Sequence, residues 1–109
     1  MPFNKTEHFV FCVKATGCLG RMQGLIGKLF PFPPLYIPRC DNIHTFFMKT
    51  PLSLLWLDDF FTVIRIDYHV LPWRIKFCVK AEHVVEFEKG KLPDGIKIGD
   101  TLTVRRYDV

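Results

Sequence analysis

Alanine, serine and side-chain amides are scarce in this sequence of 109 residues, which contains two Ala, one Ser, one Gln and two Asn. Alanine is the strongest helix former, so its scarcity beside eleven Phe residues favours β-structure. A hydrophobic content of 49% and a net charge of only +4 exclude an intrinsically disordered chain. Scattered glycines and prolines without a heptad repeat exclude a collagen-like or coiled-coil protein.

Targeting and membrane signals are missing as well. The first residues lack the basic and then apolar layout of a signal peptide, and no uncharged stretch approaches the ~20 residues of a membrane-spanning helix. The four cysteines form no C-x-x-C motif, which argues against a zinc ribbon or a thioredoxin-like redox site. We therefore expect a cytoplasmic protein with reduced thiols, no intramolecular disulfide and no membrane partner.

The length of the chain corresponds to one domain, and no linker, repeat or low-complexity tract divides it. Residues 1–109 are therefore predicted to form a single domain. Its basic residues are spread along the whole sequence without a block. This mild charge permits a nucleic-acid partner but does not favour one.

One short helix is predicted in the N-terminal half. Thr16 is placed to cap its start, and the prolines from Pro31 onward end it. Between them, apolar residues recur at steps of three and four: Leu19, Met22, Ile26 and Leu29.

The rest of the chain reads as strands and turns. Apolar runs and period-two alternation predict extended segments over Phe9–Val13, Leu35–Pro38, Ile43–Met48, Ser53–Leu57, Phe60–Asp67, Trp73–Lys80, His83–Lys89 and Thr101–Arg105. Asp58 and Asp59 form the expected hairpin turn between two of them. The predicted fold is mainly β, α+β at most, as a compact barrel-like or sandwich-like domain.

Alternation also predicts which side chains share a face. Trp73, Ile75, Phe77 and Val79 fall on one face of their segment, and basic residues fall on the other. Glu86 and Glu88 share a face of the next segment, so we expect cross-strand pairing between these acidic and basic faces.

Motifs for common catalytic chemistry are absent. The sequence has neither a phosphate-binding loop nor the H-E-x-x-H zinc motif, and its one serine, Ser53, lies in no nucleophile elbow. Asp67 and His69 lie two residues apart on a predicted strand, so the carboxylate could orient the imidazole as a general base or metal ligand. Both could equally be polar residues at the end of a strand.

The segment from Cys40 to Met48 carries the most chemistry. If it is extended, its alternate residues share one face: Cys40, Asn42, His44, Phe46 and Met48. A thiolate, an imidazole and a thioether suit a soft ion such as Cu(I), so Cys40, His44 and Met48 are candidate metal ligands. Cys40 and His44 could instead act as nucleophile and base, or the segment could be structural core or the wall of a binding site.

A set of motifs in fixed order extends over most of the chain: Arg21–Ile26, Ile43–Leu52, Pro72–Arg74, Ala81 to Glu86, Gly90 and Gly95–Asp100. Together they resemble the prokaryotic family called domain of unknown function 192, over about residues 9–104. The resemblance implies a small, single-domain, mostly β fold with a short helix, and it brings no established activity, substrate or cofactor. The family usually has Asp where this chain has Ser53.

The favoured function is a small binding or accessory module with an aromatic-lined cleft for a small molecule or peptide. We expect Arg21, His44, Phe46 and Met48 to line that cleft, and we predict no cofactor. One alternative is a soft-metal protein or small enzyme that uses Cys40, His44 and Met48, or Asp67 and His69. The other alternative is single-strand nucleic-acid binding, which is disfavoured because the segment around Trp73 separates its aromatic side chains from its cations.

Overall fold

β-Strands are the only regular elements in the part of the chain that the computed structural model describes, which comprises residues 6–14, 34–46, 48 and 50–106. The predicted helix between Thr16 and Pro31 lies outside these residues. The strands within them are β1 (Glu7–Lys14), β2 (Leu35–Pro38), β3 (Asn42–His44), β4 (Leu52–Leu57), β5 (Val63–Val70), β6 (Ile75–Phe77), β7 (His83–Glu88) and β8 (Thr101–Arg106).

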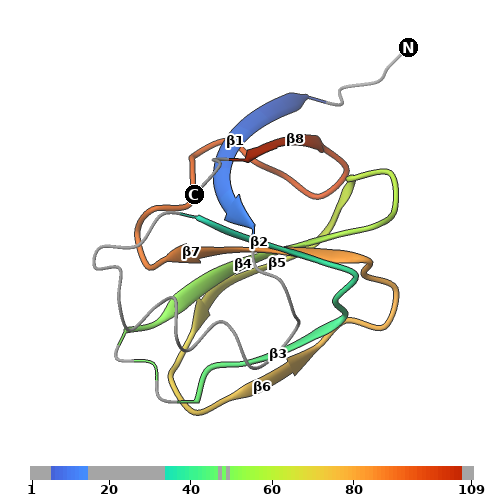
Figure 1. The fold of residues 1–109 in the computed structure, drawn as a ribbon. Helices are drawn as coiled ribbons and strands as arrows, with labels where there is room; N and C mark the ends of the chain where they lie inside the picture. Colours follow the sequence, from blue (N-terminus) through green and yellow to red (C-terminus); the bar gives the residue numbers. More distant parts are fainter. Residues whose placement is uncertain (1–5, 15–33, 47, 49, 107–109) are drawn as a thin grey trace.

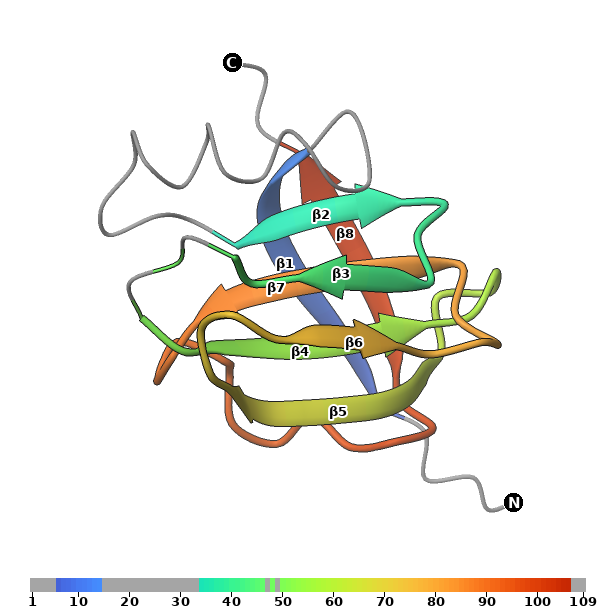
Figure 2. The same cartoon turned by 90° about the horizontal axis from the view of Figure 1, so that it is seen from below.

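Six of these strands form one sheet in the order β5-β4-β7-β2-β1-β8, and β3 pairs with β6 in a separate small sheet. β1 joins two parts of the large sheet, because it runs parallel to both β2 and β8, whereas the pairs within β2-β7-β4-β5 are antiparallel. The sheet is strongly curled, and β1 and β8 cross the other strands steeply (Figure 2). The β3-β6 pair lies on the far side of the central strands from β1 and β8 (Figure 1).

Both faces of the central strands are therefore covered. Every residue of β4 is buried, which explains why its sequence is almost continuously apolar rather than alternating. One core lies on the β3-β6 side and includes Leu35, Ile43, Leu54, Trp56 and Val84. A second core lies toward β1 and β8 and includes Val10, Leu55, Val85, Phe87 and Leu102.

The two outermost strands of the large sheet meet at one end only. Thr62, just before β5, forms an isolated antiparallel bridge with Thr101 at the start of β8. The amide of Leu102 donates to the carbonyl of Phe61 over 2.8 Å. The described residues thus form a compact all-β domain. It is not a closed barrel, because the two outermost strands meet at one end only, so the predicted barrel-like closure is incomplete.

Asp100 fixes the start of β8. Its buried carboxylate lies 2.8 Å from Nε2 of His8 on β1 and accepts a hydrogen bond from the amide of Lys97. The hydrogen bond with His8 is the main cause that holds the pKa of Asp100 below its ordinary value. The preceding residue has a φ of +98°, a conformation that favours glycine, and it is Gly99.

The hairpin predicted around Asp58 and Asp59 is confirmed, because β4 and β5 pair antiparallel on either side of this turn. The extended segment predicted over Ile43–Met48 is wrong beyond its start. β3 ends at His44, and the amide of Met48 donates to the carbonyl of Thr45, which turns the chain.

The predicted pairing of an acidic and a basic face is also wrong. β7 pairs with β2 and β4, whereas only residues 75–77 of the alternating segment form a strand, which pairs with β3. Glu86 lies between Leu35 and Leu54 on the neighbouring strands and is completely buried. Neither of its carboxylate oxygens has a hydrogen-bond partner among the described residues, and burial raises its pKa to about 8.

Candidate functional site

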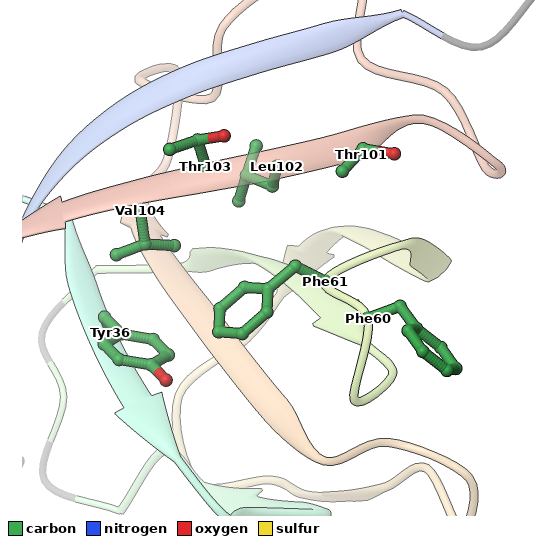
Figure 3. Close-up of a pocket in the computed structure, with 7 residues that line it drawn as sticks. All are labelled: Tyr36, Phe60, Phe61, Thr101, Leu102, Thr103 and Val104. Atoms are coloured by element: carbon green, nitrogen blue, oxygen red, sulfur yellow. The ribbon is translucent and has the colours of Figure 1, made fainter.

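A pocket of about 540 Å³ opens between β2, β8 and the loop that connects β4 to β5. Its lining residues are Tyr36, Phe60, Phe61, Thr101, Leu102, Thr103 and Val104. Figure 3 shows the ring of Phe61 directed toward Tyr36, below β8, and the ring of Phe60 directed away. The volume lies within the ~300–1,000 Å³ that is typical of sites for small molecules.

The position of Phe61 is set by a tight loop. Phe61 has a φ of 62°, in the left-handed region that bulky side chains rarely occupy. Asp58 stabilises this conformation, because Oδ1 accepts hydrogen bonds from the amides of Phe60 and Thr62, each over 2.9 Å. The carbonyl of Asp58 also accepts from the amide of Phe61. Strained residues that the surrounding structure holds in place are concentrated at functional sites.

Three rings build one wall of the site: Tyr36 and Phe61 line the pocket, and His83 supports them from behind. The Phe61 ring stacks on the imidazole of His83, with centroids 4.3 Å apart and planes 20° apart. The Tyr36 hydroxyl lies 3.1 Å from Nδ1 of His83, and the Tyr36 and Phe61 ring centroids are 6.0 Å apart. The residues come from β2, β7 and the β4–β5 loop, so three separate elements assemble this wall.

The electrostatics of the wall favour a neutral imidazole. Burial lowers the pKa of His83 below its ordinary value, and this effect outweighs the opposing influence of Glu82, Asp59 and Asp58. A neutral imidazole can accept the Tyr36 hydroxyl hydrogen at Nδ1, which a protonated ring cannot do.

The chemistry of the pocket suits binding. None of the seven described residues that line it carries a charged side chain at neutral pH, and the polar groups among them are the hydroxyls of Tyr36, Thr101 and Thr103. Such a surface can stack on a planar ring or enclose an apolar group and offer it a few hydrogen bonds.

Of the residues that the sequence placed in the cleft, the three that the structure describes lie elsewhere. Arg21 is outside the described residues. His44 and Phe46 are close, with ring centroids 4.7 Å apart, and Phe46 stacks on Trp73 at 5.6 Å. Met48 belongs to the buried core on the β3-β6 side, and among the described residues none of His44, Phe46 and Met48 lines the pocket.

Cys40 is buried and disulfide-bonded. The expectation of four reduced thiols is therefore wrong, and in this state Cys40 has no thiolate with which to bind a metal or attack a substrate. Cys12 and Cys78 are free, and burial raises the pKa of the Cys12 thiol to about 12. Within the described part of the chain, no three His, Cys, Asp or Glu side chains cluster in a way that could hold a metal ion.

Asp67 has structural partners. Oδ2 accepts a hydrogen bond from the Trp56 indole over 2.7 Å, and Oδ1 forms an ion pair with Arg65. His69 is exposed on the same strand. Ser53, at the position where the family usually has Asp, is buried and donates to the carbonyl of Tyr68. Asp67 and Ser53 therefore connect β4 and β5.

A second exposed apolar surface lies on and around β6. It comprises Trp73, Ile75, Phe77 and Val79, which are between 55% and 88% exposed. Of these residues only Ile75 and Phe77 lie on β6, and the face that they form is directed to solvent rather than into a core.

Sequence reasoning missed Tyr36, Phe61 and His83 as a group. Each lies in an ordinary apolar or turn-forming context. Tyr36 and Phe61 are 25 residues apart along the chain, and Phe61 and His83 are 22 residues apart. The only local signal was the Asp58–Asp59 turn, which indicates a constrained loop next to an aromatic pair. No helix in the described part of the chain has the length and apolarity required to cross a membrane.

Comparison with known proteins gives one match. The family described as DUF192, uncharacterized ACR, matches residues 19–104. No curated protein and no solved structure matches the chain.

Proposed function

We propose that this chain, which belongs to the DUF192 family, is a small binding module that holds an uncharged aromatic or apolar group in its aromatic-walled pocket. The group would belong to a small molecule or a peptide. The observation that carries the proposal is the stack of Phe61 on His83, held at the pocket by a strained backbone.

Two features of the stack support a binding role. A left-handed conformation costs a phenylalanine on the order of 1 kcal/mol, and a binding surface is one reason for the fold to retain it. The ring is also supported from behind by His83, which Tyr36 in turn holds by a hydrogen bond. A wall that is ordered before the ligand arrives loses less conformational entropy on binding.

The absence of charge among the described lining residues favours one class of bound group. An ionised ligand would lose its hydration without gaining a countercharge from any of the seven lining residues, which is unfavourable. A neutral ring or branched apolar group avoids this cost and gains the stacking and burial that Tyr36 and Phe61 provide.

The proposal is tested with indole as a neutral aromatic probe, titrated into isotope-labelled protein and followed by chemical-shift changes of the backbone amides. We expect the largest changes at Phe61 and at the β8 residues Leu102 and Val104. Phe61→Ala should weaken indole binding at least tenfold. The anionic ring compound benzoate should bind much more weakly than indole.

Phe77→Ala is the matched control, since it removes an exposed phenylalanine ring from the β6 surface. This variant should bind indole as the unaltered protein does. If indole instead shifts the amides of β6, and Phe77→Ala abolishes binding while Phe61→Ala does not, the pocket is not the binding site. Absence of any saturable shift in the unaltered protein would contradict the proposal as well.

A further inference from the structure

One edge of β8 borders the pocket. Along a strand, the backbone N–H and C=O groups of alternate residues point to the same edge. The amide of Thr101 donates to Thr6, toward β1, whereas the amide of Leu102 donates to Phe61, away from β1. Val104, two residues beyond Leu102, therefore directs its N–H and C=O away from β1. β8 is the last strand in the order of the sheet, so no described strand pairs with this edge at Val104.

The pairing stops because the neighbouring chain turns away. Thr62 bridges Thr101, and Phe61 accepts the bond from Leu102, so the chain before β5 follows β8 antiparallel for this short distance. At Phe61 the positive φ and the hydrogen bonds to Asp58 redirect the chain into the turn toward β4. If β5 began earlier in the chain, it would lie beside Thr103 and Val104. No described strand occupies that position.

The same stretch of β8 lines the pocket, since Leu102, Thr103 and Val104 are among its walls. A strand added to this edge would therefore lie at the pocket, and one of its side chains could enter between the strand and the ring of Phe61. We infer that the ligand is a short extended peptide that pairs with the edge of β8 at Val104 and places one aromatic or branched apolar side chain in the pocket. This inference rests on the proposed function, because it identifies what carries the bound group.

Orientation follows from the short pairing already present. A peptide that continues the line of Phe61 and Thr62 runs antiparallel to β8, so its first residues lie near Arg105 and its last residues lie near the β4–β5 loop. Arg105 is exposed at one end, and Asp59 is exposed at the other. A peptide with an acidic residue first and a basic residue last complements both charges.

The edge itself is suited to addition. Natural edge strands are usually protected by proline, by a bulge or by charged side chains that block pairing. At the position whose outward edge no described strand pairs, β8 has Val104, and Thr103 precedes it. Strand addition gives affinity through main-chain hydrogen bonds, while pockets for alternate side chains give specificity.

The test uses the peptide acetyl-Glu-Thr-Val-Phe-Thr-Lys-amide and two derivatives that are N-methylated at the Val or at the Phe. Adjacent peptide amides point to opposite edges, so one derivative should lose at least tenfold in affinity and the other should bind nearly as the parent does. In the complex, hydrogen exchange of the Val104 amide should slow at least tenfold, whereas indole should leave it unchanged. A peptide with the Glu and Lys exchanged should bind more weakly.

Val104→Pro separates this inference from the proposed function. Proline removes the outward N–H without removing a bond to β1, and edges tolerate it at such positions. Because Val104 also lines the pocket, the variant should bind indole somewhat more weakly, but its affinity for the peptide should fall at least tenfold more. Two outcomes would refute strand addition: both N-methylated peptides bind as well as the parent, or hydrogen exchange of the Val104 amide does not slow in the complex. If indole still binds the unaltered protein in either case, the pocket remains a small-molecule site. The peptide derivatives and the exchange measurement decide the question even if the proline variant does not fold.

Discussion

The Phe61 ring lies flat against the His83 imidazole, 4.3 Å away, although 22 residues separate the two in the chain. Each depends on a different constraint. Phe61 is held by the Asp58 loop, and His83 by the Tyr36 hydroxyl. The pocket wall is therefore sensitive to groups that do not line the pocket, and the first two predictions concern these groups.

Asp58→Ala should loosen the loop that positions Phe61. It removes the acceptor of two backbone hydrogen bonds, so we expect the free energy of unfolding to fall by about 1–2 kcal/mol. Indole binding should weaken as well, because Phe61 is no longer held in its left-handed conformation. Denaturation in urea and the indole titration measure the two effects. Asp59→Ala, at the exposed neighbouring carboxylate, should change neither, and equal losses in both variants would contradict this role of Asp58.

His83 should make the protein less stable in mild acid. Because burial lowers its pKa in the folded state, the unfolded chain binds the proton more readily below about pH 6.5. The stability present above that pH is therefore lost as the pH falls toward the lowered pKa. Urea denaturation at pH 7.5 and 5 should show a smaller loss in His83→Gln than in the unaltered protein. The exposed His69→Gln variant should behave like the unaltered protein, and identical losses in all three would rule out this effect.

Glu86 should make the protein less stable as the pH rises, which is the opposite of the effect expected from His83. Its folded pKa of about 8 lies above the ordinary value of 4.5, so between these values the folded protein keeps a proton that the unfolded chain releases. Stability should fall as the pH rises through this range, by at most about 1.4 kcal/mol per pH unit. Glu86→Leu fills an apolar site between Leu35 and Leu54 and should remove most of this slope between pH 6.5 and 8. Glu82→Leu, at an exposed carboxylate, should retain it; a slope unchanged in Glu86→Leu would exclude Glu86 as its source.

Cys40 should resist alkylation until the protein is reduced. In denaturant without reductant, peptide mapping after iodoacetamide treatment should find Cys12 and Cys78 labelled and Cys40 unlabelled. Reduction before alkylation should label Cys40 as well. Labelling of Cys40 in unreduced, freshly purified protein would show that the bond is absent and would restore the expectation of a reduced thiol.

The sequence was sufficient to predict the class of fold and most strands. Continuous apolar runs such as Leu52–Leu57 indicate extended chain wherever they pack, and paired acidic residues such as Asp58 and Asp59 favour a turn. These are local properties, and the structure confirms most of the predicted strands and the hairpin. The motifs from Arg21 to Asp100 also identified the family correctly.

Only the tertiary structure decided which faces are buried and which side chains meet. Alternation separates the two faces of a strand, but it does not show which face is covered. Phe77 is exposed and Glu86 is buried, although phenylalanine is usually buried and glutamate is usually exposed. The predicted shared face from Cys40 to Met48 is interrupted for a related reason. The chain turns after His44, and same-face parity holds only while a strand continues. The pocket depends on the curl of the sheet, which brings β8 beside Phe61, and that contact is set by long-range pairing that no local pattern encodes.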